Sequence, residues 1–190
     1  MQIQRFAIRD LLLITPVKHT DARGFFSEVY RSDALLAAGV NTQFVQDNHV
    51  YSQKNGVLRG LHFQTPPHAQ GKLVRCIKGA ILDIAVDIRT GSPTFGQHVA
   101  VELSAVNWHQ LWVPPGFAHG YLTLKAGCEV VYKVTQYWDS SAERGIAWDD
   151  PALAIDWGLS APDLTIAEKD RNNPRLADLE PVFRYEPENF

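Results

Sequence analysis

Apolar and polar residues alternate in short stretches through the middle of the chain, and these stretches are rich in β-branched and aromatic side chains. Glycine, proline, asparagine or serine separates one stretch from the next, as at Lys78-Gly79 and Ala126-Gly127. The pattern predicts β-strands at residues 73–77, 80–88, 98–103, 110–113, 121–124 and 129–138. Many short strands at this spacing indicate an all-β antiparallel sandwich or barrel.

Helical patterns are few, which argues against a parallel α/β sheet. Residues 32–38 predict one helix, with Ser32 as the residue that caps its first turn. Residues 163–169 predict a second, short helix, and the polar tail from Pro181 is expected to pack loosely. The sequence contains no repeat and no linker, so we expect one domain over residues 1–190.

Composition and charge narrow the range of functions. Hydrophobic residues make up 45% and charged residues 21%, which is ordinary for a globular protein. A net charge of −3 offers no excess of cations for a nucleic acid, although a small anionic ligand needs only a few local cations. The apolar run from Leu11 to Ile14 is too short to cross a bilayer, and the N-terminus does not resemble a signal peptide. We therefore expect a cytoplasmic protein with no membrane or nucleic-acid partner.

The stretch from Gly56 to Gln64 is the first candidate for chemistry, because it carries Arg59 and His62 in a strand-like run. In a regular strand, residues three apart face opposite sides. A bulge at Gly60 would turn both side chains to the same side. The alternative is a surface arginine and a hydrogen-bonded core histidine, and this stretch alone favours neither.

Two further positions are candidates because of the turns beside them. Lys72 opens a strand directly after a glycine, where a cation can hold a phosphate or stabilise an oxyanion. His119 follows the rigid Pro-Pro-Gly turn at residues 114–116. Taken alone, each has an ordinary explanation: Lys72 can be a solvated surface lysine, and His119 can be a turn histidine hydrogen-bonded to the backbone. Cys76 and Cys128 lie in strand-like stretches with no polarising neighbour, so we expect buried free thiols.

The strand predicted at residues 129–138 would place Tyr132 and Trp138 on one face, because residues an even number apart point the same way. If that face lines a barrel interior, a phenol and an indole share one cavity, although two core aromatics are the commoner outcome. Asp170 follows the short helix predicted at residues 163–169. A carboxylate there can orient an imidazole, or it can belong to a solvated run of charges.

Eight short motifs occur in order along nearly the whole chain, from about Phe6 to Leu179. They are RGFF-x-E at 23–28, QDNH at 46–49, GVLRGLH at 56–62, KLVR at 72–75, VDIR at 86–89 followed by SPTFG at 92–96, PGFAHG at 115–120, VYK at 131–133 and EKD at 168–170. Together they closely resemble the dTDP-4-dehydrorhamnose 3,5-epimerase family, which are cupin-fold enzymes of deoxysugar synthesis.

The resemblance implies a cupin-type β jelly roll with a few short peripheral helices. It also implies a homodimer, in which the N-terminal segment contacts the partner, and a small-molecule substrate, a dTDP-4-keto-6-deoxyhexose. The expected reaction is epimerisation at C3 and C5, on the path to dTDP-L-rhamnose. No cofactor and no metal are expected.

The same resemblance assigns roles by position. His62 matches the family's base and Asp170 the acid that orients it. Tyr132 matches the proton donor on the opposite face, and Lys72 the residue near the C4 oxygen. The residues that match positions contacting the sugar, the diphosphate or the thymine are Arg23, Phe26, Glu28, Gln46, Asn48, Arg59, His119, Trp138, Glu143 and Lys169. In the dimer, Arg23 and Glu28 in particular would come from the other subunit.

The residue types suit this chemistry. A proton next to a ketone is acidic only if the enolate is stabilised, which requires a base on one face, an acid on the other and donors at the carbonyl oxygen. An unperturbed imidazole titrates near ~6.5 and an unperturbed phenol near ~10, so at neutral pH the first accepts and the second keeps a proton. A carboxylate beside the imidazole would fix its tautomer and stabilise the imidazolium.

A metal-dependent cupin oxygenase would be an enzyme of a different class. Metal-binding cupins offer His-x-His, then a Glu, then a later His, whereas here position 64 is Gln and no Glu follows between Phe63 and Leu82. Only His62 and His119 remain of that set, and two histidines do not complete a metal site. An epimerase that inverts only C3 or only C5 stays open, as does a binding module without turnover.

The sequence departs from the family pattern at a few places. Val50 stands where the family usually has Ser, and the stretch before Gly56 is one residue longer than is typical. His19 lies where an aromatic residue is often found near the thymine, and Trp138 replaces the more usual Tyr. These changes concern the expected nucleotide contacts and the dimer interface, and leave His62, Asp170 and Tyr132 unaffected.

Overall fold

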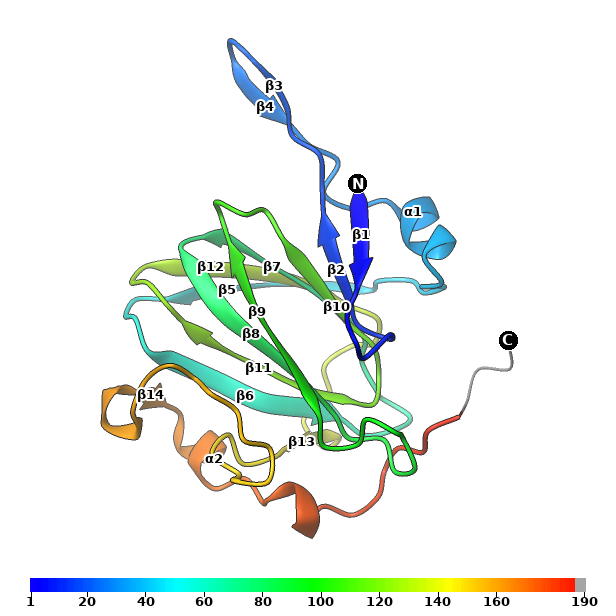
Figure 1. Cartoon of the computed structure of the whole chain (residues 1–190), viewed down its shortest axis with the longest axis vertical. Coiled ribbons are helices and arrows are strands. Elements are labelled where there is room, and N and C mark those ends of the chain that lie inside the picture. The colour runs from blue at the N-terminus through cyan, green and yellow to red at the C-terminus, as the bar shows by residue number, and fades with distance from the viewer. Residues whose placement is uncertain (187–190) are drawn as a thin grey trace.

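Two β-sheets face each other and enclose a flattened barrel (Figure 1). The computed structural model describes residues 1–186. The first sheet has the strand order β1 (Gln2–Arg5), β2 (Leu12–Thr15), β10 (Gln110–Val113), β7 (Lys72–Lys78), β12 (Cys128–Val134) and β5 (Gln46–Ser52). The second has the order β13 (Glu143–Gly145), β6 (Val57–Gln64), β11 (Phe117–Thr123), β8 (Ala80–Asp87) and β9 (His98–Ser104), with β14 (Thr165–Ile166) beside β6. Except for the parallel pairing of β14 with β6, neighbouring strands are antiparallel, so the predicted all-β architecture is confirmed.

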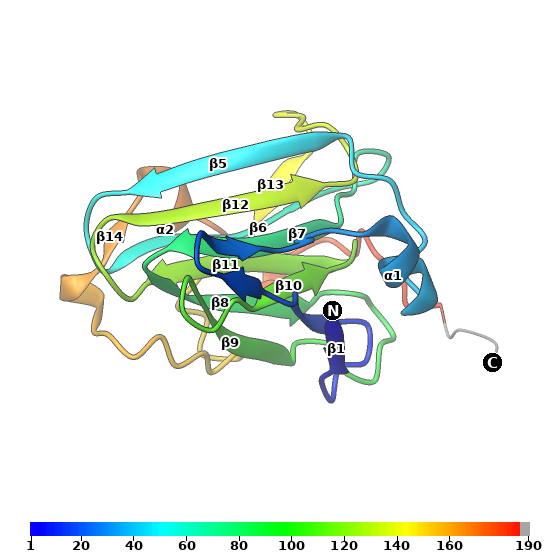
Figure 2. The ribbon, with the colours of Figure 1, turned by 90° about the horizontal axis from the view of Figure 1, so that it is seen from above.

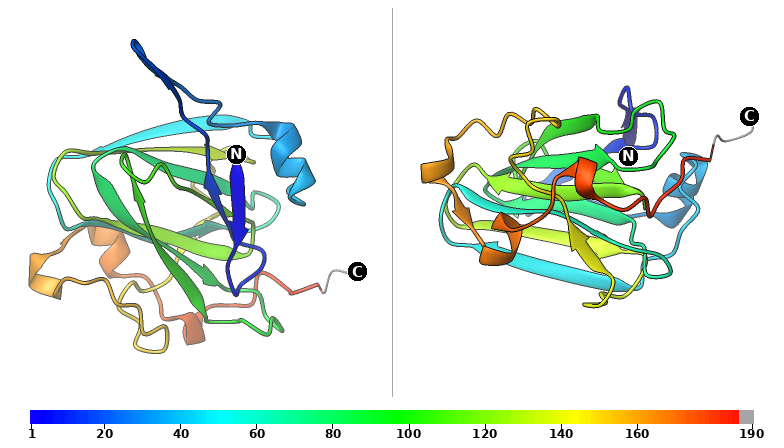
Figure 3. Two further views of the ribbon diagram at one scale, coloured as in Figure 1. Left: turned by 45° about the horizontal axis from the view of Figure 1, so that its top comes forward. Right: turned by 90° about the horizontal axis from the view of Figure 1, so that it is seen from below.

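The period-two pattern explains which side chains fill the barrel. Along β8, Ile81 and Ala85 belong to the cluster between the sheets, whereas Ile84 and Val86 belong to a second cluster on the outer face. The C-terminal segment covers that outer face, as the view from below shows (Figure 3). Because both faces of the second sheet are covered, its strands are largely apolar, with β11 buried at every position.

Helices are peripheral. Helix α1 (Ser32–Ala37) lies at the edge of the first sheet, and α2 (Glu168–Arg171) lies beneath β6 (Figures 1 and 2). The remaining helical pieces are two single 3-10 turns, at Ala161–Asp163 and Leu176–Asp178. None of the helices among residues 1–186 has the length and apolar character needed to span a bilayer.

An N-terminal hairpin, β3 (His19–Asp21) with β4 (Gly24–Phe26), projects away from the barrel (Figures 1 and 3). Every residue of its two strands is exposed. Phe25 and Phe26 are 55% and 66% exposed, which is unusual for phenylalanines in ordered strands. The hairpin therefore presents apolar surface that this chain does not itself cover.

Three predictions about strands and helices were wrong, each for an identifiable reason. Strand β12 ends at Val134 rather than at residue 138, because its partners β5 and β7 both begin opposite Val134. The helix predicted at 163–169 is replaced by β14 and the short α2, since Ile166 is buried by parallel pairing with β6. Strand β11 begins at Phe117, so His119 lies inside a strand and not in the preceding turn.

Two further corrections concern Ser32 and the tail. Ser32 is the first helical residue; the cap position is Arg31, without a side-chain cap bond. The start of the tail is packed rather than loose, because Phe183 packs on the outer cluster with its ring centroid 6.1 Å from that of Phe63. Residues 187–190, which complete the predicted domain, lie outside the described residues. Cys76 and Cys128 are buried free thiols, as predicted.

Candidate active site

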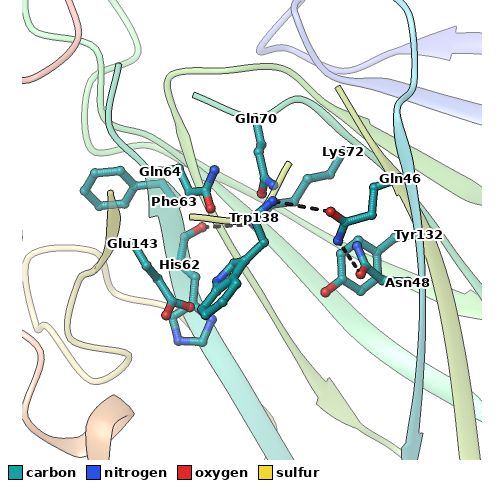
Figure 4. Close-up of a pocket in the computed structure, with 10 residues that line it drawn as sticks. All are labelled: Gln46, Asn48, His62, Phe63, Gln64, Gln70, Lys72, Tyr132, Trp138 and Glu143. Atoms are coloured by element: carbon teal, nitrogen blue, oxygen red, sulfur yellow. Dashed lines mark hydrogen bonds between the residues drawn. The ribbon is translucent and has the colours of Figure 1, made fainter. Parts of the chain in front are cut away.

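A cavity of about 280 Å³ opens between the two sheets at the end of the barrel where β7 begins. Strands β5, β7 and β12 contribute from one sheet, and β6 and β13 from the other. Figure 4 shows the residues that line it: Gln46, Asn48, His62, Phe63, Gln64, Gln70, Lys72, Tyr132, Trp138 and Glu143. Most of these are polar, so the cavity suits a polar ligand.

His62 is held by a buried carboxylate. Its Nε2 lies 2.6 Å from Asp170 Oδ1, and the side chains of the two residues are 24% and 3% exposed. The other carboxylate oxygen of Asp170 accepts a hydrogen bond from the Gly60 backbone N–H at 3.2 Å. Burial alone would raise the pKa of Asp170, but the bonds from His62 and Gly60 outweigh it and hold that pKa below its usual value. The carboxylate therefore stays ionised and fixes the imidazole.

A bulge in β6 turns Arg59 and His62 to the same side, which is one of the two alternatives that the sequence left open. On β11, His119 pairs with His62 and Tyr121 with Arg59, so three residues of β6 span the distance of two on β11. Gly60 takes a φ of 122°, which is open to glycine and strained for other residues. The same bulge frees the Gly60 N–H for Asp170, so one local irregularity both aims the imidazole and helps to anchor its partner.

Lys72 lies at the start of β7, with its Nζ 3.3 Å from the His62 carbonyl oxygen. Burial lowers the pKa of this lysine to about 8, while the charges of Asp83 and Glu143 act in the opposite direction. Lys72 is therefore mostly protonated at neutral pH, but its pKa lies only a little above that pH. A cation in this position can stabilise negative charge that develops on a bound oxygen.

Tyr132 faces the cavity from the opposite sheet, on β12 (Figure 4). Burial raises the pKa of its phenol; the Arg59 charge opposes this rise and the Glu143 charge adds to it. The phenol therefore keeps its proton at neutral pH and can give it to a strong base such as a carbanion. His62 and Tyr132 line one cavity from opposite sheets, so an imidazole and a phenol can act on two faces of anything bound there.

Trp138 lies beyond the end of β12 and not on its face, yet it reaches the cavity through a loop. Its backbone N–H donates to Gln46 Oε1 at 3.3 Å, and Gln46 in turn donates to Asn48 Oδ1 at 2.8 Å. The side chain remains 58% exposed, leaving a flat apolar ring at the entrance. Such a ring offers a stacking surface for a planar group.

Glu143 and Lys169 form a second ion pair at the edge of the site, 3.1 Å apart. Lys169 and Asp170 are consecutive in α2, so one helix holds both Glu143 on β13 and His62 on the neighbouring β6. The Lys169 side chain is 61% exposed, so this pair contributes little to stability. Its effect is to position the Glu143 carboxylate at the cavity.

His119 lies beside the site and not in its lining. Its ring is buried, with Nε2 2.9 Å from Asp83 Oδ1, and its backbone pairs with His62 across β11 and β6. Arg59 is not among the lining residues either, but its charge reaches Tyr132.

The structure does not bring the hairpin residues to the cavity. Arg23 is paired with Asp21 on the exposed hairpin, and Glu28 is paired with Arg31 beside α1. Phe26 is exposed and stacks on His19, with the ring centroids 6.5 Å apart. In this chain the predicted binding residues Arg23, Phe26 and Glu28 are therefore not among those that line the cavity.

Four residues at or behind the site were not predicted: Phe63, Gln64, Gln70 and Asp83. Gln64 and Gln70 line the cavity and donate to loop carbonyls, Gln64 to His68 at 2.6 Å and Gln70 to Gln136 at 2.7 Å. Asp83 is fully buried behind His119. Its position was a usable signal, because a carboxylate at an inward position of an apolar strand requires a partner.

Position 64, where a metal-binding cupin would place a second histidine, is occupied by Gln64, whose side-chain amide is hydrogen-bonded to loop carbonyls. Its Oε1 also accepts from the Asp139 N–H at 2.8 Å. Within residues 1–186 no group of three or more His, Cys, Asp or Glu side chains is placed to hold a metal. His62 and His119 are instead paired with carboxylates.

Comparison with known proteins identifies the family of the chain. The family described as dTDP-4-dehydrorhamnose 3,5-epimerase matches residues 5–178. A protein of that description from Sinorhizobium fredii is 48% identical over 188 residues, covering 97% of this chain and 94% of its own. Another from Pseudomonas aeruginosa is 50% identical over 179 residues, covering 94% and 97%.

A solved structure is similar over the whole fold. The enzyme dTDP-6-deoxy-D-glucose-3,5-epimerase from Legionella pneumophila, determined in complex with dTDP-4-keto-L-rhamnose, superposes with a TM-score of 0.93 at 43% identity. The match covers 98% of this chain and 99% of that one.

The cupin-like β-sandwich, with a polar cavity that His62 and Tyr132 line from opposite sheets, and the named relatives identify a carbohydrate epimerase. Since the family match spans most of the chain and the relatives match nearly end to end, the resemblance found in the sequence is confirmed. The chain belongs to the dTDP-4-dehydrorhamnose 3,5-epimerase family.

Proposed function

We propose that the protein epimerises C3 and C5 of dTDP-4-dehydro-6-deoxy-D-glucose, giving the 4-keto precursor of dTDP-L-rhamnose. One observation supports this most directly: His62, held by Asp170 at 2.6 Å, and the Tyr132 phenol face one cavity from opposite sheets. Inversion at carbon requires a proton to leave one face and another to arrive at the other.

In each inversion the unprotonated His62 nitrogen takes the proton from the carbon next to the C4 ketone. The electron pair of the broken C–H bond moves to the C4 oxygen, forming an enolate whose charge Lys72 stabilises. Tyr132 then gives its proton to the same carbon from the other face, and the ketone re-forms. Asp170 stabilises the imidazolium while it exists. The carbon exchanges one proton for another and no electron leaves the sugar, so no redox cofactor is required.

The remaining predicted residues serve binding. We assign Gln46, Asn48 and Trp138, at the entrance, to the nucleotide end of the ligand. We assign Arg59, His119 and the Glu143–Lys169 pair, which lie on or beside the strand that carries His62, to the sugar end of the ligand.

We further propose that the functional unit is a homodimer and that residues 1–190 form one domain, the hairpin of which reaches the partner. The exposed His19–Phe26 stack and the nearby Arg23 support this, because they are suited to a thymine and a diphosphate but lie far from this chain's own cavity. Two free thiols support a cytoplasmic setting, where cysteines stay reduced.

The test is turnover of the dTDP-4-keto sugar in D₂O, followed by NMR. The proposal predicts deuterium at both C3 and C5 of the product. Deuterium at one position only would replace it with a single-site epimerase. No exchange, with dTDP binding retained, would indicate a binding module, and loss of activity with a chelator would favour a metal-dependent enzyme. His62→Ala should abolish exchange and keep nucleotide binding.

A further inference from the structure

Asp83 is a charged residue at the centre of the barrel interior that the proposed mechanism does not use. It lies on β8, fully buried, among residues of which Ile81 and Ala85 face the apolar core between the sheets. Burying a carboxylate in such surroundings destabilises the folded protein unless other groups compensate its charge.

The local hydrogen bonds compensate it only in part. Asp83 Oδ1 lies 2.9 Å from His119 Nε2. Oδ2 is buried and accepts no hydrogen bond from any residue in the described range 1–186, and the hydroxyl of Tyr121, the cross-strand neighbour of Asp83, is in the same situation. The carboxylate therefore has charge left to interact with a cation at longer range.

That cation is Lys72. Its pKa is set first by burial, which lowers it to about 8, and then by Asp83, the leading charge that keeps it from falling further. Three residues face the Lys72 ammonium: Asp83 on β8, Glu143 on β13 and His62 on β6. The Tyr132 phenol lines the same cavity, and the Arg59 charge acts on that phenol. Of these groups only Asp83 and Glu143 favour the protonated lysine in the free enzyme.

We propose that Asp83 is a positioning residue of the epimerase site: it fixes the ring of His119 through Nε2, and its buried, unpartnered Oδ2 supplies a countercharge to the Lys72 ammonium, which receives the enolate. This inference rests on the proposed function. Asp83 does not line the cavity; it acts through His119 and Lys72, as Asp170 acts through His62. The site thus contains two histidine–aspartate pairs with separate tasks, one for the base and one for the oxyanion.

The experiment compares Asp83→Asn with wild type over pH 6–9. We expect kcat to fall roughly 10- to 100-fold at pH 7, which is the usual effect of removing a carboxylate that is hydrogen-bonded to a residue of the site. Without the countercharge the pKa of Lys72 falls further, because the Asp83 charge is what opposes the effect of burial. The ratio of wild-type to variant kcat should therefore grow as pH rises from 6 to 8, while the affinity for dTDP is unchanged.

Asp87→Asn is the matched control. Asp87 is also fully buried on β8, but it bonds to Arg89, Ser92 and Thr94 away from the cavity. This variant should lose stability and keep the wild-type pH profile. A folded Asp83→Asn enzyme with a pH-independent activity ratio would overturn the proposal, because damage to packing alone gives that result.

A measurement on the wild type keeps the test decisive if Asp83→Asn does not fold. Neutron diffraction at pH 7 should show a deuteron on His119 Nε2, three on Lys72 Nζ and none on Asp83. A protonated Asp83 or a neutral Lys72 would overturn the inference. Failure of the proposed function is distinguishable, because the wild type itself would then incorporate no deuterium into the sugar.

Discussion

Gly60 and Gly120 lie back to back on β6 and β11, so close that a Cβ built on Gly60 would be 2.5 Å from the Gly120 Cα. A Cβ on Gly120 would lie 2.6 Å from the Arg59 carbonyl oxygen. Both strands need a bare backbone here, since the extra residue of the β6 bulge is accommodated against β11. The direction of the His62 imidazole thus depends on a glycine in the neighbouring strand.

Gly120→Ala should push the bulge out of register. We expect a loss of roughly 1–3 kcal/mol in the free energy of unfolding, as for other overpacked sites, and at least about tenfold in kcat, because misplaced catalytic groups act poorly. Urea unfolding and steady-state kinetics measure the two effects. Gly127→Ala is the control: its φ of 68° is strained for alanine, but nothing lies within 4 Å of the new Cβ, so it should lose stability alone. Full activity in Gly120→Ala would contradict the role of the bulge.

Asp170→Asn should separate orientation from binding. The amide can still accept from the Gly60 N–H, but it carries no charge to stabilise an imidazolium. We expect kcat to fall roughly 100-fold or more, with dTDP affinity unchanged by calorimetry. Asp156→Asn, in an exposed loop where the carboxylate serves only a local bond to the Gly158 N–H, should leave both quantities unchanged. Unaltered kcat in Asp170→Asn would contradict the assignment of His62 as base.

The site was more predictable than the elements that carry it. A glycine between two polar residues three apart made the bulge at Gly60 one of two alternatives, and the cavity shared by His62 and Tyr132 agrees with the resemblance carried by the ordered motifs. Trp138 lines the cavity, but it does so from a loop beyond β12 and not from the face of the predicted strand. No local pattern indicates that β12 loses both partners at Val134, because that end is set by where β5 and β7 begin.

The segment before Asp170 shows the same limit. Residues 163–169 have helical character, yet Thr165 and Ile166 pair with β6 and bury Ile166. Long-range pairing overrides local propensity there, and the residues themselves do not reveal it. The N-terminal segment shows another limit: the sequence places Arg23 and Glu28 in a binding motif, while in this chain they pair with Asp21 and Arg31 and do not line the cavity.

Acid should weaken the fold through Asp87. Burial raises the pKa of this carboxyl, but hydrogen bonds from Arg89, Ser92 and Thr94 outweigh it, so the pKa in the folded protein lies below the ordinary 3.8. The stabilisation is therefore complete above the unfolded pKa and is lost as pH falls through the folded one. At pH 7, Asp87→Asn should cost roughly 3 kcal/mol of unfolding free energy, and the difference from wild type should shrink below about pH 4.

Urea unfolding at pH 7 and pH 3 measures this difference. Asp178→Asn, at an exposed carboxyl, should leave the unfolding free energy nearly equal to that of wild type at both pH values. A difference for Asp87→Asn that is equally large at pH 3 would contradict the linkage, because it would then come from altered packing rather than from the charge.

Tyr132→Phe should separate proton removal from inversion. His62 and Lys72 remain, so the base can still take a proton and return it, or a solvent deuteron, to the same face of the sugar. The other face has lost its donor, and inversion should fall roughly 10²- to 10⁴-fold. In D₂O, NMR should show deuterium entering the substrate with its configuration retained. Tyr137→Phe, whose side chain is 62% exposed near the cavity, is the matched control and should invert at the wild-type rate. If Tyr132→Phe also inverts at that rate, the proton arrives from another group and the two-sided mechanism fails.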